Sequence, residues 1–237
     1  MKRISWLMSL VLFGAMGGVG GWYLVAPAAK SVGGGIPRLR EYGHAPSFKL
    51  TDQLGRTVNS KAFARKVRVV SFLFPYCTEY CPYIAEWMVD TGKLLEREGW
   101  GNRVQLVSFD VDPGHTTPKV LRAFMKQYGW NPTDSRWEFL TGSPSAIRRA
   151  VTGGYHISYQ HVVRQGGDGG DSDSGPGVHG YNPLARKARP GYDVEHNDSV
   201  IIVDREGRIR AVIARAYRLE PRQLVSLVRK AWSSSPD

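Results

Sequence analysis

Two cysteines, Cys77 and Cys81, are the only thiols in a chain of 237 residues. They stand between the apolar run from Val67 to Phe74 and an amphipathic pattern that begins at Pro82. Two sulfurs at this spacing can exchange electrons with another thiol pair, hold a soft metal ion, or close a structural disulfide bond. A purely structural role is the weakest of these, because so short a disulfide loop removes little entropy from the unfolded chain.

The predicted position of the pair favours ionised sulfur. Residues four apart lie on one face of a helical turn, and the free N–H groups and positive dipole end of a starting helix stabilise thiolate. Two convergent thiolates suit Cu(I), or zinc if further ligands are added. A redox role stays open, although the spacing has one residue more than the C-x-x-C of thioredoxin-type oxidoreductases.

A third ligand would favour metal binding over electron exchange. His196 is the first candidate because it stands just before a predicted central strand, where a loop could face the cysteine turn. His115 follows another predicted strand and is the second candidate. Either of two acids, Glu195 and Asp112, could orient the imidazole of His196, or could simply be solvated. The remaining histidines are expected to be ordinary surface residues: His44, His156, His161 and His179.

Strands and helices alternate along most of the chain. Apolar runs predict strands at Val67 to Phe74, Val104 to Asp112 and Trp137 to Gly142. Hairpins are expected around Leu54-Gly55 and from Asp198 to Ala214. Helical spacing predicts helices from Pro82 to before Gly99, from Pro118 to before Gly129, near Ser143 to Val151, and from Pro221 to Trp232. This order indicates a three-layer α/β fold with a mixed central sheet.

The segment from Gln160 to Val194 does not fit this alternation. It contains the glycine-rich stretch "GGDGGDSDSGPG", from Gly166 to Gly177, which has no apolar anchor. Such a composition predicts a mobile surface insertion at about residues 160–194.

The N-terminal segment carries a signal for membrane insertion. Ile4 to Ala29 contains no charged residue and follows Lys2 and Arg3. About 20 apolar residues are enough to form a transmembrane helix across a bilayer core. Positive charge before the span predicts a cytoplasmic N-terminus and a body on the extracytoplasmic, periplasmic side of the cytoplasmic membrane.

A cleaved signal peptide is the alternative, since Ala26 to Ala29 offers small residues. The apolar run is longer than the roughly 7–15 residues of a signal core, which favours a retained single-pass anchor. We therefore expect a membrane anchor or signal segment at 1–29, a linker at 30–43 and the folded domain at 44–237.

The net charge is +11, from 32 Lys and Arg against 21 Asp and Glu. This balance favours an acidic protein face or anionic lipid as a partner. Nucleic acid is not expected, because the chain carries no nucleic-acid motif and is predicted to be exported.

Three motifs in order resemble one known family. They are C-x-x-x-C-P after a strand, "FDVDPGHTTPKVLRAF", and a histidine in "DVEHNDSVIIVDREGRI". Together they resemble the SCO/SenC family of membrane-anchored, thioredoxin-fold copper proteins that help to assemble cytochrome c oxidase. The similarity covers about His44 to Trp232.

The resemblance implies that Cys77, Cys81 and His196 bind one copper ion, Cu(I) or Cu(II). That ion would be delivered to, or used in maturing, the copper A site of the oxidase. The chain would then be a metallochaperone rather than a turnover enzyme. Its partner would be the copper-site subunit of the oxidase or another exported copper or thiol protein. The alternative is an extracytoplasmic thiol-disulfide oxidoreductase, in which Cys77 attacks and Cys81 resolves.

Overall fold

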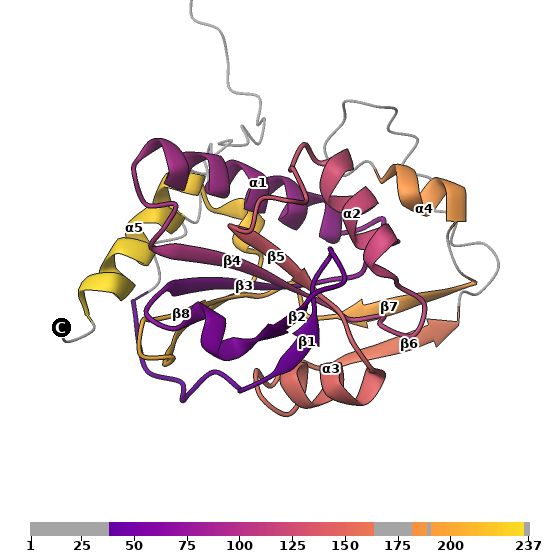
Figure 1. Ribbon diagram of the computed structural model, residues 1–237, viewed down its shortest axis with the longest axis horizontal. Helices are drawn as coiled ribbons and strands as arrows, with labels where there is room; N and C mark the ends of the chain where they lie inside the picture. Colours follow the sequence, from indigo (N-terminus) through magenta and orange to yellow (C-terminus); the bar gives the residue numbers. More distant parts are fainter. Residues whose placement is uncertain (1–37, 164–181, 189–190, 235–237) are drawn as a thin grey trace, which may run out of the picture. The chain divides into compact units, whose positions relative to one another are not determined.

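A five-stranded mixed sheet forms the centre of the fold, in the order β5-β4-β3-β8-β9 (Figure 1). The computed structural model describes residues 38–163, 182–188 and 191–234. Three neighbouring strands are parallel: β3 (Val67–Leu73), β4 (Val104–Asp110) and β5 (Trp137–Leu140). The other two are antiparallel to their neighbours: β8 (Val200–Val203) and β9 (Ile209–Ile213).

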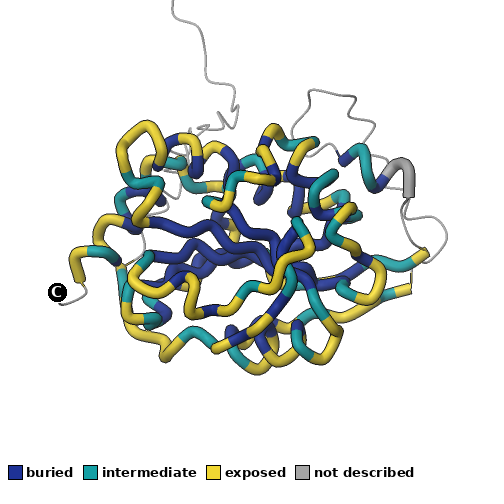
Figure 2. The backbone as a smooth tube through the Cα atoms, viewed as in Figure 1, coloured by how far each residue is buried: buried dark blue, intermediate teal, exposed yellow. Residues whose placement is uncertain are grey.

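The two central parallel strands are buried along their whole length, as their continuous apolar sequences predict. All seven residues of β3 and all seven of β4 are buried, and Figure 2 shows these strands as the dark centre of the molecule. One pair of polar side chains joins the two strands: the hydroxyl oxygens of Ser71 and Ser108 lie 2.7 Å apart. Burying a large aliphatic side chain stabilises a fold by about 1.5–3 kcal/mol, so these two strands contribute substantially to stability.

Helices cover both faces of the sheet and complete three layers (Figure 1). On one face lie α1 (Cys81–Arg97) and α5 (Pro221–Ser233). On the other lie α3 (Pro144–Val151) and the hairpin of β1 (Lys49–Thr51) and β2 (Thr57–Asn59). The predicted three-layer arrangement is confirmed. Helix α2 (Pro118–Gln127) also packs on the sheet, with the ring centroid of Phe124 5.6 Å from that of Phe139 in β5. Two short 3-10 helices connect these parts: η1 (Ser60–Phe63) and η2 (Ala216–Arg218).

Helix α1 shows why the cysteine turn is held firmly. Its buried side chains recur at helical spacing, as predicted from the sequence. Trp87 is one of them, and its indole N–H donates to the carbonyl of Leu219 at 2.9 Å, just before α5 begins. The helix therefore packs on the core through its buried face, and Trp87 links it to the segment before α5.

A separate two-stranded ribbon lies beside the main sheet. It pairs β6 (Tyr159–Val163) with β7 (Tyr192–His196), and α4 (Pro183–Ala188) precedes β7. The surface insertion predicted at about residues 160–194 therefore begins and ends in paired strands, which the sequence analysis did not predict. Pairing across the 28 residues that separate the two strands supplies order that neither short strand signals alone. The glycine-rich stretch, residues 166–177, lies outside the described residues.

Across the described part of the chain, every helix is too short or too polar to cross a bilayer. The predicted anchor at residues 1–29 lies outside that part, as does the linker up to residue 37. The anchor therefore stays a prediction.

Candidate metal centre

The two cysteines follow the central strand β3 in a tight turn. The backbone N–H of Cys77 donates to the carbonyl of Phe74 at 3.0 Å, and Cys81 is the first residue of α1. Cys77 therefore precedes the helix, whereas the sequence analysis placed both cysteines on one helical turn. Both side chains are buried, with exposed fractions of 6% and 0%, and both are free thiols.

His196 lies against this turn. Its Nε2 is 3.2 Å from the sulfur of Cys81, although 115 positions separate the two residues in the chain. Its Nδ1 lies 3.0 Å from the carbonyl oxygen of Asn197. A carbonyl only accepts, so Nδ1 carries the hydrogen atom and the lone pair of Nε2 faces the sulfur. The sequence analysis placed His196 in a loop, but it is the last residue of β7, where strand pairing fixes its direction.

The two thiols are electrostatically unequal. The hydrogen bond from Cys81 is the largest effect that holds the pKa of Cys77 well below that of an ordinary thiol, against the opposing effect of burial. The hydrogen bond and positive charge of His196, when its ring is protonated, lower that pKa further. Burial raises the pKa of Cys81 well above the ordinary value, and its hydrogen bond to Cys77 adds to that rise. Burial is the largest single effect on the pKa of His196 and lowers it, but the hydrogen bond and charge of Cys77, with the hydrogen bond to Asn197 and the charge of Asp193, together raise that pKa. Negative charge therefore concentrates on Cys77.

Neither acid that was expected to orient His196 contacts its ring. The carboxylate of Glu195 accepts a hydrogen bond from the Gln160 amide at 2.9 Å, across the ribbon. The carboxylate of Asp112 contacts His115, His161 and Tyr192 instead. The backbone carbonyl of Asn197 takes the orienting role, because it directly follows the histidine and lies within hydrogen-bond reach of Nδ1.

Asn182 is a supporting residue that the sequence analysis missed. Its buried side-chain amide donates to the carbonyl oxygens of Pro75 at 2.9 Å and Cys77 at 2.6 Å. Its side-chain oxygen accepts from the backbone N–H groups of Leu184 and Ala185 and so caps α4. The Asn-Pro dipeptide that opens α4 could have indicated the cap, but not the link to the cysteine turn.

Aromatic side chains surround the cysteine turn. Tyr80 and Tyr83 are exposed, and both stack on Tyr217 with ring centroids 6.0 and 5.7 Å apart. On the other side, the ring of Phe74 packs on Tyr76 and Tyr192. The sulfurs therefore lie in a mostly apolar rim that limits access of water.

Comparison with known proteins identifies the family. The family model SCO1/SenC matches residues 38–175, more than half of the chain. The chain belongs to the SCO1/SenC family. Because the match includes both cysteines and ends before His196, the family assignment does not depend on the position of that histidine.

Individual SCO1/SenC relatives are distant. The "SCO1 protein homolog" of Bacillus subtilis is 33% identical over 95 residues, which are 40% of this chain and 47% of that protein. The match thus spans about half of that relative's length.

Solved structures of the family share the fold. Bradyrhizobium japonicum ScoI with copper bound is 21% identical, with a TM-score of 0.57 over 80% of this chain and 99% of that one. BsSco, described as a member of the Sco family of cytochrome c oxidase assembly proteins, is 22% identical. Its TM-score is 0.58 over 81% of this chain and 95% of that chain. The α/β fold is therefore the thioredoxin-like fold of Sco proteins, with a central mixed sheet.

Proposed function

We propose that this SCO1/SenC protein binds one copper ion through Cys77, Cys81 and His196. The observation that supports the proposal most directly is the 3.2 Å approach of the His196 Nε2 to the Cys81 sulfur. The imidazole comes from β7 and the sulfur from the start of α1, so the contact is made by the tertiary structure.

The chemistry of the donor set suits copper. Two sulfurs and one imidazole nitrogen form a soft set that favours Cu(I), and His196 presents a lone pair because its other nitrogen carries the hydrogen atom. The low pKa of Cys77 supplies one thiolate without a metal, and a bound cation would offset the cost of ionising Cys81. The buried, apolar surroundings would protect such an ion from water.

We propose that the ion serves cytochrome c oxidase assembly, by delivery to its copper A site or by maturing that site. Two relatives support this step: a ScoI structure holds copper, and BsSco is named a member of a family of oxidase assembly proteins. The partner would be the copper-site subunit of the oxidase or another exported copper or thiol protein.

We also propose that residues 1–29 anchor the protein in the cytoplasmic membrane, with residues 44–237 on the extracytoplasmic side. The uncharged run from Ile4 to Ala29 after two positive charges supports this arrangement. Membrane fractionation with protease treatment of intact spheroplasts tests it. Protease-resistant protein in the soluble fraction would contradict it.

Anaerobic titration of the reduced full-length protein with Cu(I) tests the ligand set. We expect one tightly held equivalent, weakened at least 100-fold in Cys77→Ser, Cys81→Ser and His196→Ala. His44→Ala is the matched control, because His44 is exposed and lies outside the cysteine turn. If His196→Ala retains copper as tightly as the parent protein, the proposed ligand set is wrong.

A thiol-disulfide oxidoreductase is the second candidate function, and the low pKa of Cys77 favours it. The Cys77 thiolate would attack a partner disulfide, and Cys81 would then displace the partner's sulfur. The partner gains two electrons and two protons as a dithiol, and Cys77 and Cys81 become a disulfide. Reduction of an exported disulfide substrate by His196→Ala at the parent rate would favour this function. Absence of exchange with any disulfide substrate would exclude it.

A further inference from the structure

We propose that Asp112, His115 and His161 form a second metal site, one for a divalent ion such as Zn²⁺ or Cu²⁺. Their ligand atoms all lie within 4.8 Å of one another. A search of the described residues for three His, Cys, Asp or Glu side chains with ligand atoms this close together finds this group. The proposal does not rest on the proposed copper function, because none of the three residues belongs to the Cys77, Cys81 and His196 set.

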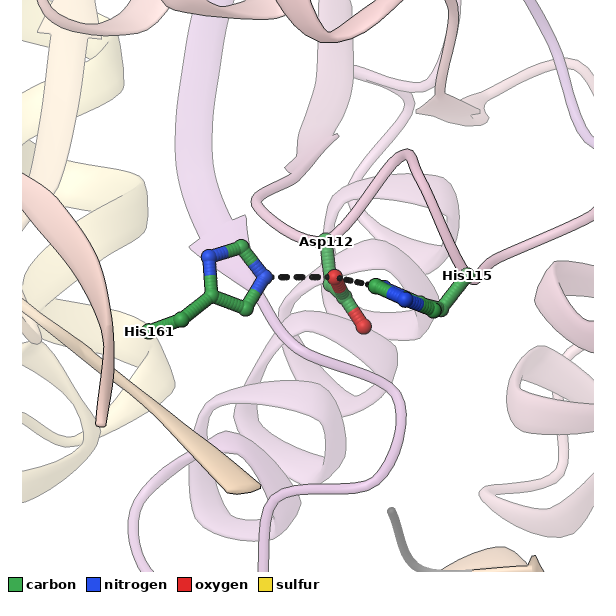
Figure 3. Close-up of side chains that lie close together, drawn as sticks. All are labelled: Asp112, His115 and His161. Carbon is green, nitrogen blue, oxygen red and sulfur yellow. Dashed lines mark hydrogen bonds and ion pairs between the residues drawn. The ribbon is translucent and has the colours of Figure 1, made fainter. Parts of the chain in front are cut away.

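The three ligand atoms converge from two parts of the chain: the turn after β4 carries Asp112 and His115, and β6 carries His161 (Figure 3). The Nδ1 of His115 is 2.9 Å and the Nε2 of His161 is 2.8 Å from the same oxygen of Asp112, its Oδ1. Figure 3 shows the two rings reaching that carboxylate from opposite sides. Ligands about 2.0–2.2 Å from a zinc ion lie roughly 3 Å from one another, so only small side-chain shifts would admit an ion.

The carboxylate is held in one orientation. Asp112 has no exposed surface, and the hydroxyl of Tyr192 donates to its second oxygen, Oδ2, at 2.5 Å. That bond leaves Oδ1 for the two imidazoles and fixes its direction. A carboxylate hydrogen-bonded on its other oxygen is the usual support of a metal-ligating acid.

The histidine rings leave space for further ligands. The side chain of His115 is 59% exposed and that of His161 is 46% exposed. Water could therefore complete the coordination of an ion held by three protein atoms. The Nδ1 of His115 and the Nε2 of His161 each share a hydrogen atom with the Asp112 carboxylate. Metal binding requires that hydrogen to move to the other nitrogen of the same ring.

The donor types select the class of ion. Two imidazoles and one carboxylate suit Zn²⁺, Cu²⁺ or Ni²⁺, whereas Cu(I) prefers sulfur. Binding should be tightest for Cu²⁺, following the general order of affinity for divalent ions. The cysteine turn and this second site are thus expected to hold ions of different charge and softness.

The ribbon connects the two sites. On β6 and β7, Tyr159 pairs with His196 and His161 pairs with Val194, so His161 and His196 project from the same face. The pairs are two residues apart, or roughly 7 Å along the strand. An ion joining His161 to Asp112 would therefore fix the ribbon that carries His196 against the end of β4.

Zinc binding by the full-length protein tests the proposal. In a Cys77→Ser/Cys81→Ser background we expect one retained equivalent of Zn²⁺ after dialysis, measured by elemental analysis. Adding His115→Ala and His161→Ala should weaken the affinity of the protein for Zn²⁺ at least 10-fold, and adding Asp112→Asn should do the same. His44→Ala serves as the control and should leave the affinity unchanged. Zinc retained without both histidines, or not bound at all, would overturn the proposal.

A second measurement avoids the cysteine substitutions, which alter buried residues. With both cysteines present, His115→Ala/His161→Ala should bind one equivalent of Zn²⁺ less than the parent protein. The Cu²⁺ complex of the parent should show an electron paramagnetic resonance signal with coupling to nitrogen that this variant loses. Equal stoichiometry and equal spectra would contradict the second site, whatever the outcome of the Cu(I) titration.

Discussion

The sulfur of Cys81 and the Nε2 of His196 lie 3.2 Å apart, at the meeting point of the central sheet and the β6-β7 ribbon. One belongs to the first turn of a helix packed on the core, and the other ends a ribbon outside the main sheet. The position of the ribbon therefore decides whether the sulfur has a nitrogen neighbour. Five predictions concern the cysteine turn, the residues that support it and the core below it.

The unequal thiols predict selective alkylation at Cys77. Because its pKa is held well below the ordinary value, Cys77 should form thiolate at a lower pH than an ordinary thiol does. An ordinary thiol would react roughly 100-fold more slowly at pH 6 than at pH 8. We expect a much smaller difference at Cys77 and almost no reaction at the fully buried Cys81. Mass spectrometry after brief treatment with iodoacetamide measures both sites in one chain.

Removing His196 should change that reactivity. His196→Ala deletes one of the hydrogen bonds that lower the pKa of Cys77, so its labelling at pH 6 should slow several-fold. His44→Ala is the control and should label like the parent. Equal rates for His196→Ala and the parent would mean that the imidazole does not stabilise the thiolate.

Asn182→Asp should loosen the cysteine turn. Aspartate keeps the side-chain oxygen that caps α4, but it cannot donate to the carbonyls of Pro75 and Cys77. Leaving buried carbonyls unpaired costs about 1–3 kcal/mol. The free energy of unfolding of the reduced protein, measured in denaturant, should fall by that amount. Asn59→Asp changes a capping asparagine without such donors and should have little effect.

Gly92→Ala should destabilise the protein, although helix propensity alone predicts a gain of about 1 kcal/mol. A Cβ atom at Gly92 would lie 2.7 Å from the ring of Trp130 and 3.0 Å from Leu106. Overpacking of this kind costs about 1–3 kcal/mol. Thermal unfolding should show a lower midpoint for Gly92→Ala than for Asp90→Ala, an exposed site on the same helix. A higher midpoint for Gly92→Ala would show that α1 can shift away from β4.

The buried carboxyl group of Glu138 should make the free energy of unfolding depend on pH. Burial, with the nearby charge of Asp52, raises the pKa of Glu138 to about 7, and its Oε2 has no hydrogen-bond partner among the described residues. In the unfolded chain, the Glu138 carboxyl group loses its proton near pH 4.3. The folded protein therefore binds more protons between about pH 4.3 and 7, and stability from this group falls as pH rises through that window.

Glu138→Gln should remove that fall. At pH 8 we expect the variant to be more stable than the parent by about 1–3 kcal/mol, because it removes a buried carboxylate whose Oε2 has no hydrogen-bond partner among the described residues and whose Oε1 lies 3.7 Å from the Arg56 guanidinium. At pH 5 the difference should be small. Denaturant unfolding at several pH values measures both, with the exposed Glu41→Gln as control. Parallel pH curves for Glu138→Gln and the parent would show that Glu138 is not the titrating group.

Local sequence was sufficient for the elements that build the core. Continuous apolar runs identified β3 and β4, and helical spacing after Pro82 identified α1. The same local signals located the cysteine turn between β3 and α1. These predictions succeeded because strand and helix periodicity depends on residues that are close in the chain.

The tertiary structure alone decided which distant groups meet. Asp112 was expected to support His196, yet it binds the two imidazoles of His115 and His161, the second of them 49 positions away. Asn182 reaches back 105 positions to the carbonyl of Cys77. Each of these side chains is small and polar and gives no periodic signal. The β6-β7 ribbon brings His161 to Asp112, and the start of α4 brings Asn182 to the cysteine turn. No local pattern encodes either meeting.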